Sequence, residues 1–101
     1  MAKIEFLNEI TEIIKKRKLT QPENSYIAEL MAEGLPKISQ KLGEEAVEVV
    51  VAALAEDKAR LVSESADLIF HLMILLDSKD LNILDVVKEL DNRNKKWTSK
   101  N

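Results

Sequence analysis

Apolar residues recur at helical spacing along most of the chain. In the first stretch they lie three and four positions apart from Ile4 to Ile14, and four basic residues follow at Lys15–Lys18. This periodicity predicts an amphipathic helix whose last turn carries cations, which suit the negative end of the helix dipole. Pro22 and its polar neighbours then interrupt the pattern, so residues 19–24 are predicted to form a loop.

The next two helices have recognisable ends in the sequence. Ser25 is a residue type that caps helix amino termini and Gly34 one that ends helices, so a short helix is predicted between them. Pro36 fits the first turn of a longer helix, predicted over 36–55. Its Val49–Val51 run favours a strand by propensity, but the helical spacing continues over a segment too long for a typical strand.

The second half of the chain is also predicted to be helical. A charged break over 56–60 indicates a turn or kink, and a second long helix should follow over about 60–77. Asn82, with an acid three residues later, resembles a capping box that opens a last helix. The tail over 93–101 is expected to be partly frayed, with Trp97 packed on a partner or on the body of the protein.

Composition supports one all-α domain. The 101 residues include only two glycines and two prolines, and good helix formers dominate. We therefore expect a helical bundle of about four to five helices, with a single domain over 1–101. The two central helices are apolar on almost every side, a pattern typical of helices that are buried all round. One short chain offers little protein to cover them, so a homo-oligomer, most simply a homodimer, is predicted.

Several classes of function are disfavoured by the same composition. A net charge of -3 offers no basic field for nucleic acid, and the absence of cysteine fits a reducing compartment such as the cytoplasm. No apolar run approaches the roughly 20 residues of a membrane span. The sequence has no nucleophile beside a histidine and no glycine-rich phosphate loop, which leaves a metal-activated water as the expected chemistry.

Charged residues gather on one face of the first central helix. At about 100° per residue, Glu48 lies about 40° and Lys41 about 60° from Glu44, with Glu45 at about 100°. A solvated stripe is the simpler interpretation, with an ion pair from Lys41 to Glu44 or Glu45 across one turn.

The second central helix strengthens the alternative interpretation, a metal site. Glu64, Asp67 and His71 share one narrow stripe of a helix that is otherwise apolar. An antiparallel hairpin would bring them opposite Glu44 and Glu48. Buried carboxylates need cations to neutralise them, and Mg²⁺ prefers oxygen ligands while leaving positions for a phosphate substrate.

The other polar candidates have ordinary alternatives. His71 is either a satisfied core histidine or a partner that orients Asp67 from one turn away. Tyr26, next to Ser25 at a helix start, either packs or meets a phosphate through hydroxyls and free amides. The basic cluster either ends its helix or contacts phosphate, with Arg17 as the best candidate.

At this point the combined motifs resemble a known family. The resemblance rests on Ser25-Tyr26 with Leu30 and Gly34, on Lys41-Leu42-Gly43-Glu44-Glu45-Ala46-x-Glu48, and on Glu64-x-Ala66-Asp67-Leu68-Ile69-Phe70-His71-Leu72. This set is similar to that of the phosphoribosyl-ATP pyrophosphohydrolases, within the all-α MazG-like superfamily of nucleoside triphosphate pyrophosphohydrolases. Two positions depart from the pattern, Ile27 in place of a frequent threonine and Phe70 in place of a common tyrosine.

The resemblance implies an activity and an assembly. It implies Mg²⁺-dependent hydrolysis of phosphoribosyl-ATP to phosphoribosyl-AMP and pyrophosphate, the second step of histidine biosynthesis. It also implies an intertwined homodimer in which helices of both subunits build the sites. Many relatives are fused to the cyclohydrolase of the next step. Because the present chain ends at Asn101, we expect it to be monofunctional and to need that enzyme separately.

The resemblance also assigns site residues. The implied metal ligands are Glu44, Glu45, Glu48, Glu64 and Asp67. Of these, Glu45 is either a ligand or the base that activates water. Lys41 and Arg17 would hold phosphate oxygens, and Ser25 and Tyr26 would contact the substrate.

Two alternatives stay open from the sequence. A housekeeping MazG-like pyrophosphohydrolase acting on other nucleoside triphosphates would share the carboxylates but would have no reason for the Ser-Tyr pair. A non-catalytic helical binding module would have no need of so costly an acidic cluster.

Overall fold

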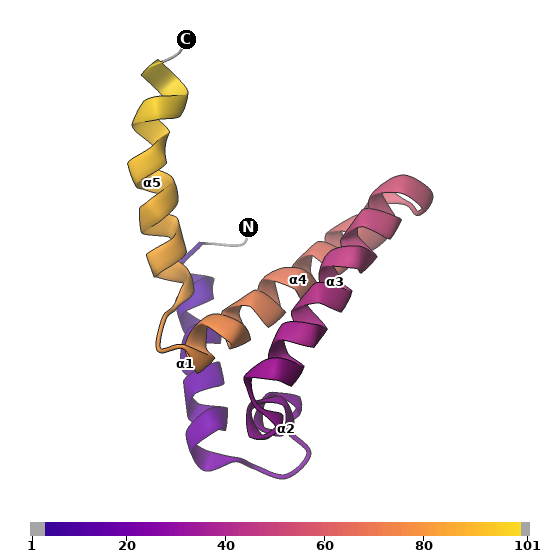
Figure 1. The fold of residues 1–101 in the computed structure, drawn as a ribbon, viewed down its shortest axis with the longest axis vertical. Coiled ribbons are helices and arrows are strands. Elements are labelled where there is room, and N and C mark those ends of the chain that lie inside the picture. The colour runs from indigo at the N-terminus through magenta and orange to yellow at the C-terminus, as the bar shows by residue number, and fades with distance from the viewer. Residues whose placement is uncertain (1–3, 100–101) are drawn as a thin grey trace.

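The computed structural model describes residues 4–99, and these fold into five α-helices without a strand (Figure 1). The predicted all-α class is therefore confirmed. In chain order the helices are α1 (Phe6–Thr20), α2 (Tyr26–Glu33), α3 (Leu35–Ala55), α4 (Lys58–Ser78) and α5 (Ile83–Ser99). None of them is both long and apolar enough to cross a lipid bilayer.

The predicted ends of α2 are confirmed. The Ser25 side-chain oxygen accepts a hydrogen bond of 3.2 Å from the amide of Ala28, which caps the helix. At the other end Gly34 has φ 90° and ψ 177°, a backbone region that is essentially restricted to glycine. α3 begins directly afterwards, with Pro36 in its first turn as expected.

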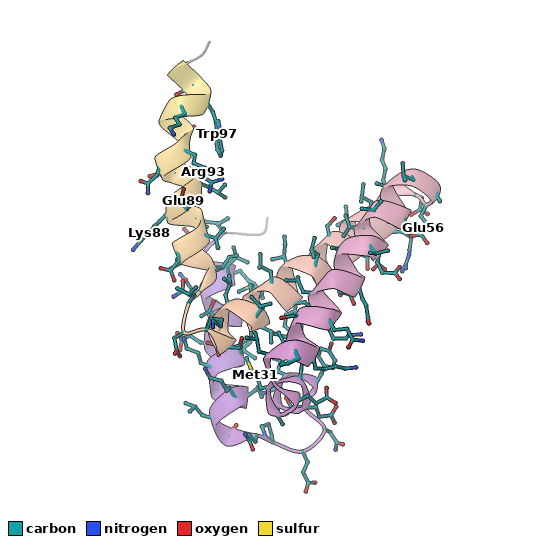
Figure 2. The ribbon with its side chains drawn as sticks, in the orientation of Figure 1. Met31, Glu56, Lys88, Glu89, Arg93 and Trp97 are labelled. Atoms are coloured by element: carbon teal, nitrogen blue, oxygen red, sulfur yellow. The ribbon has the colours of Figure 1, made fainter. Side chains whose placement is uncertain are left out.

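Two predicted boundaries were wrong by about two residues. α1 continues through Thr20, into the predicted loop, because Gln21 adopts the left-handed C-cap and its amide donates to the carbonyl of Arg17. α4 begins at Lys58 because Asp57 caps it: one carboxylate oxygen accepts from the amide of Arg60 at 2.8 Å. The break between α3 and α4 is therefore short, and Glu56 lies at the tip of the resulting hairpin (Figure 2).

The last helix begins as predicted and continues further than expected. The Asn82 amide donates to the Asp85 carboxylate at 2.9 Å, and the Asn82 side-chain oxygen accepts from the Leu84 amide at 2.8 Å, which confirms the capping box. Residues 93–99 are helical rather than frayed, while residues 100 and 101 lie outside the described part. Trp97, near the far end of α5 in Figure 2, is 53% exposed and so is not buried against the body.

The hydrophobic core lies at one end of the hairpin. There α1, α2, the start of α3, the end of α4 and the start of α5 meet, and they contribute Ile14, Ile27, Leu30, Ile38, Met73, Ile74 and Ile83. Away from this core α3 and α4 pack mainly on each other, and Figure 1 shows the hairpin and α5 extending in different directions.

Within one chain the hairpin is not buried all round, contrary to the pattern that its sequence suggests. Leu54 is 84% exposed, Val62 70% and Val47 61%. Val50, Val51 and Ile69 are also exposed. One chain has only α1, the eight-residue α2 and the start of α5 to cover two helices of 21 residues each, and these elements pack at the core end.

An ion-pair clamp joins α1 to the end of α4. Asp77 is only 2% exposed, and its Oδ1 accepts a hydrogen bond of 3.1 Å from Nζ of Lys15. Its Oδ2 lies 2.7 Å from Nζ of Lys18, an ion contact without the alignment of a hydrogen bond. Two of the four basic residues in the predicted cluster are thus used to neutralise one buried carboxylate.

Candidate active site

Three carboxylates meet between the two arms of the hairpin. Oxygen atoms of Glu45 on α3 and of Glu64 and Asp67 on α4 all lie within 4.8 Å of one another. Glu64 is 7% exposed, Glu45 is half-buried and Asp67 is exposed, so the cluster runs from the helix interface to the surface. The antiparallel packing of α3 and α4 brings these positions together.

The structure differs from the sequence-based expectation about which α3 carboxylates face α4. Glu44 and Glu48 were expected opposite Glu64 and Asp67, but both are exposed and neither belongs to the three-residue cluster. The buried residues of α3 explain this. Ile38 and Ala52 lie seven residues before and after Glu45, within about 20° of it around the helix, so the face of Glu45 is the one turned toward α4.

Arg60 is a site residue that the sequence analysis missed. Its Nη2 donates to Oε1 of Glu64 at 2.7 Å, and its Nε lies 3.9 Å from Glu56. A guanidinium therefore partly neutralises the most buried member of the cluster. The signal was present in the sequence, since Arg60 precedes Glu64 by four residues, a spacing that brings side chains together on a helix.

Lys41 forms the ion pair that the simpler interpretation of this face predicted. Its Nζ lies 3.3 Å from Oε1 of Glu44, while Gln40 donates to the other oxygen at 3.0 Å. The hydrogen bond from Gln40, followed by that from Lys41, lowers the pKa of the Glu44 carboxyl. The hydrogen bond to Glu44, followed by the nearby Tyr26, raises the pKa of Lys41. Lys41 thus stays a cation next to the cluster.

Tyr26 and His71 connect α2 to the helix that carries Asp67. The Tyr26 hydroxyl lies 2.7 Å from Nε2 of His71, and Nδ1 of His71 lies 2.7 Å from the main-chain oxygen of Asp67. His71 therefore contacts the backbone of Asp67 and not its carboxylate, which matches the alternative of a satisfied core histidine and not that of a partner orienting the Asp67 side chain. Burial raises the pKa of the Tyr26 phenol; Lys41 opposes this shift and Glu45 adds to it.

Of the two other predicted substrate contacts, Ser25 directly precedes Tyr26, and Arg17 lies near the opposite end of α4 from the carboxylates. Ser25 is 4% exposed, and its hydroxyl oxygen serves as the α2 cap. Arg17 lies between Lys16 and Lys18 at the Asp77 end of α4, ten residues or about 15 Å along the helix from Asp67. Its guanidinium makes no ion pair with any residue in the described range, 4–99.

The cluster fits a hard divalent cation. Ligand oxygens at about 2.1 Å from Mg²⁺ are about 3 to 4 Å apart in an octahedron, and the three carboxylates already lie close to this spacing. All of their possible metal ligands are oxygen atoms. Arg60 pairs with one oxygen of Glu64, and no other described side chain forms an ion pair with the cluster.

Comparison with known proteins identifies the family. The sequence profile of phosphoribosyl-ATP pyrophosphohydrolases matches residues 7–94. The chain belongs to this family. The match includes all of α2, α3 and α4 and thus the whole carboxylate cluster, and family membership makes the chain a hydrolase for a pyrophosphate bond.

Individual relatives agree with the family assignment. The chain is 52% identical over 89 residues to the phosphoribosyl-ATP pyrophosphatase of Novosphingobium aromaticivorans, which covers 88% of this chain and 83% of the relative. It is 43% identical over 91 residues to the enzyme of the same name from Ignicoccus hospitalis, covering 89% of that protein. It is also 50% identical over 91 residues to the histidine biosynthesis bifunctional protein of Photobacterium profundum, of which it spans only 44%.

Proposed function

We propose that this chain hydrolyses phosphoribosyl-ATP to phosphoribosyl-AMP and pyrophosphate in a Mg²⁺-dependent reaction, the second step of histidine biosynthesis in the cytoplasm. The observation that carries the proposal is the cluster of Glu45, Glu64 and Asp67 between two helices that the family profile covers. The oxygen of a water molecule bonds to one of the two phosphorus atoms of the α–β phosphoanhydride, the bond from that phosphorus to the bridging oxygen breaks, and the bridging oxygen leaves with the other product.

Glu45, Glu64 and Asp67 would hold the metal, with Glu44 and Glu48 as further ligands from the adjoining face of α3. When bound, Mg²⁺ supplies positive charge that neutralises phosphate oxygens and polarises the bond to be broken. Glu45 would act either as a ligand or as the base that takes a proton from the attacking water; its half-buried position within the cluster supports both roles.

Cationic side chains would bind the phosphates. Glu44 holds Lys41 beside the cluster through an ion pair of 3.3 Å. Because this pair is partly exposed, a phosphate oxygen can replace Glu44 as the partner of Lys41 at little cost. Arg17, on α1, lies near the Asp77 end of α4 and so is far from the carboxylates of its own chain. In the proposed dimer it would instead reach the phosphates bound at the site of the second subunit. Ser25 would contribute by holding the start of α2, and with it Tyr26, in place.

The assembly proposed with this activity is a homodimer whose interface includes the exposed apolar face of the hairpin. Val47, Leu54 and Val62 are each more than half exposed in one chain, and Val47 and Leu54 lie on the side of α3 opposite Glu45, turned away from α4. A second copy of the same hairpin would bury this surface from water. At roughly 25 cal/mol per Å² of apolar area, that burial strongly favours association.

The dimer is tested by sedimentation equilibrium at micromolar concentration. Val62→Lys should shift the mass toward that of one chain, because it places a charge in the interface. Leu19→Lys is the matched control, since Leu19 is 81% exposed near the end of α1, next to Lys18 and the Asp77 end of α4 and not beside Val62. A wild-type mass of one chain, or equal behaviour of the two variants, would refute the dimer.

The activity is tested by pyrophosphate release from phosphoribosyl-ATP beside a panel of ordinary nucleoside triphosphates, each with Mg²⁺ and with a chelator. Selective, Mg²⁺-dependent turnover of phosphoribosyl-ATP is the expected result. Turnover of the ordinary nucleotides instead would support the metal-dependent chemistry of the carboxylates but would refute the proposed role in histidine biosynthesis. No turnover of any substrate would favour a binding module.

A further inference from the structure

The hydrogen bonds around His71 define where its proton lies. Nδ1 faces the main-chain oxygen of Asp67 at 2.7 Å, and a carbonyl oxygen can only accept, so Nδ1 carries a hydrogen. A neutral imidazole has a single N–H, which leaves Nε2 as an acceptor. The Tyr26 hydroxyl, 2.7 Å from Nε2, must then donate its only proton to His71.

The surrounding residues hold this arrangement in place. His71 is 6% exposed, and its ring packs edge-on against both Tyr26 and Phe70, with centroids 5.6 Å apart in each pair. Tyr26 is the first residue of α2, whose start is fixed by the buried Ser25 cap. A 180° flip of the histidine ring would put carbon atoms in the places of both nitrogens and so break both hydrogen bonds.

The hydroxyl oxygen of Tyr26 lies beside the candidate site, because it contacts His71, one helical turn from Asp67 on α4. Tyr26 is 44% exposed, and Lys41, Glu45 and Asp67 are close enough to act on its ionisation. Because the Tyr26 hydroxyl donates its only proton to His71, its oxygen can act toward a bound ligand only as a hydrogen-bond acceptor. A phosphate oxygen, which is an acceptor at neutral pH, has nothing to bond with it.

We infer that His71 is a positioning residue that fixes the Tyr26 hydroxyl as a hydrogen-bond acceptor, so that Tyr26 reads a hydroxyl or amino group of the nucleotide and not a phosphate. This inference rests on the proposed function for the identity of the ligand. It assigns His71 a role through Tyr26 and replaces the expected contact of Tyr26 with phosphate by one to the sugar or the base.

The proton arrangement is tested without any turnover. The chain has one histidine and one tyrosine, so the ring nitrogen signals of ¹⁵N-labelled, untagged protein need no assignment. At pH 8 the Nδ1–H form is expected, and Tyr26→Phe should shift the Nε2 signal toward that of a nitrogen without a hydrogen-bond donor. A ring protonated at Nε2, or an Nε2 signal unchanged in Tyr26→Phe, would overturn the inference.

The role in recognition is tested with three single variants and one double variant. Tyr26→Phe and His71→Leu should each raise KM for phosphoribosyl-ATP about tenfold, with kcat changed less than about threefold. In His71→Gln the side-chain oxygen can accept a hydrogen bond from the Tyr26 hydroxyl, so this variant should have most of the substrate affinity that His71→Leu loses. Tyr26→Phe combined with His71→Leu should be no worse than either alone, because both remove the same contact.

Several outcomes would contradict this role. Additive effects in the double variant, or a loss in kcat with KM unchanged, would overturn the positioning inference. If His71→Leu does not fold, Tyr26→Phe and His71→Gln still decide the question. If the wild type does not turn over phosphoribosyl-ATP, the proposed function fails, and the ¹⁵N measurement separately decides the arrangement of His71 and Tyr26.

Discussion

Arg60 donates a hydrogen bond of 2.7 Å to Glu64, the most buried carboxylate of the cluster. The guanidinium is about half exposed, whereas the Glu64 side chain is 9% exposed, so the pair lies at the boundary between the helix interface and water. Without a metal, Arg60 is the only side chain in the described residues that gives Glu64 an ion pair. A divalent cation in the cluster must act against this positive charge.

Arg60→Met should therefore bind Mg²⁺ about threefold to tenfold more tightly, as expected from removal of one unit charge about 6 Å away in a partly aqueous medium. The same variant should melt at a lower temperature in chelator, because Glu64 then lacks its counter-ion. Isothermal titration and thermal melts with and without Mg²⁺ measure both effects. Arg93→Met is the matched control, since Arg93 pairs with Glu89 at the same spacing on α5 (Figure 2). An equal Mg²⁺ affinity in the two variants would contradict the competition.

Asp67→Asn should reduce turnover by roughly 100-fold or more, because it removes a charged ligand from the cluster. Its stability in chelator should be unchanged or higher, since repulsion within the cluster falls, and Mg²⁺ should no longer raise its melting temperature. The main-chain bond to His71 is unaffected by this change. Asp91→Asn, at an exposed position on α5, should match the wild type in both measurements. Near-normal activity of Asp67→Asn would refute the metal-site assignment.

Asp77→Ala should lower the free energy of unfolding by about 2 kcal/mol in urea denaturation. The value is below the 3 to 5 kcal/mol typical of a broken buried pair, because Lys15 and Lys18 are partly exposed and can return to water. Asp91→Ala should stay within about 0.5 kcal/mol of the wild type. Activity of the folded fraction should persist, since the clamp lies at the far end of α4 from the carboxylates.

The clamp also predicts a pH dependence at the alkaline end. The hydrogen bond and charge of Asp77 raise the pKa of Lys15. A folded-state pKa above the unfolded value of about 10.4 means that this stabilisation is complete below about pH 10 and is lost as the pH rises through the raised pKa. Tyr26 and Lys41, whose pKa values are also raised, act in the same direction.

In Lys15→Met the decline of unfolding free energy above pH 10 should accordingly be shallower than in the wild type. Lys16→Met should retain the wild-type slope, because the ammonium group of Lys16 makes no ion pair with a residue in 4–99. Urea denaturation at closely spaced pH values from 8 to about 11.5 gives the slopes. Identical slopes in the two variants would show that the clamp does not contribute to the alkaline dependence.

The two glycines should respond in opposite ways to substitution by alanine. Gly34→Ala should destabilise the protein by about 1 to 3 kcal/mol, because φ 90° with ψ 177° is strained for any side chain. Gly43→Ala should stabilise it by about 0.5 to 1 kcal/mol, since Gly43 is inside α3 and an added Cβ meets no atom within 4 Å. If Gly43→Ala is more stable but less active, the result would show that the absence of a side chain at position 43 lets a ligand come close to the α3 backbone beside Glu44 and Glu45. Unchanged activity would leave Gly43 without a role at the site.

The sequence by itself determined the helices and most of their ends, because those features depend on residues at most four positions apart. Ser25 with Ala28, Asn82 with Asp85, and the Lys41–Glu44 pair are contacts of this kind. The residue types of the site were also evident from the sequence, since a carboxylate that is buried in an apolar helix needs a cation to neutralise it.

Only the tertiary structure decided which of these groups meet. α3 is apolar on so many sides that its pattern leaves its rotation about the helix axis open, and packing against α4 selects Glu45 over Glu44 and Glu48. The contacts from Lys15 to Asp77 and from Tyr26 to His71 join residues 62 and 45 positions apart, so no local spacing reveals them. They depend on how helices pack across the core, which is set by the combined shape of several elements and not by the periodicity of any one.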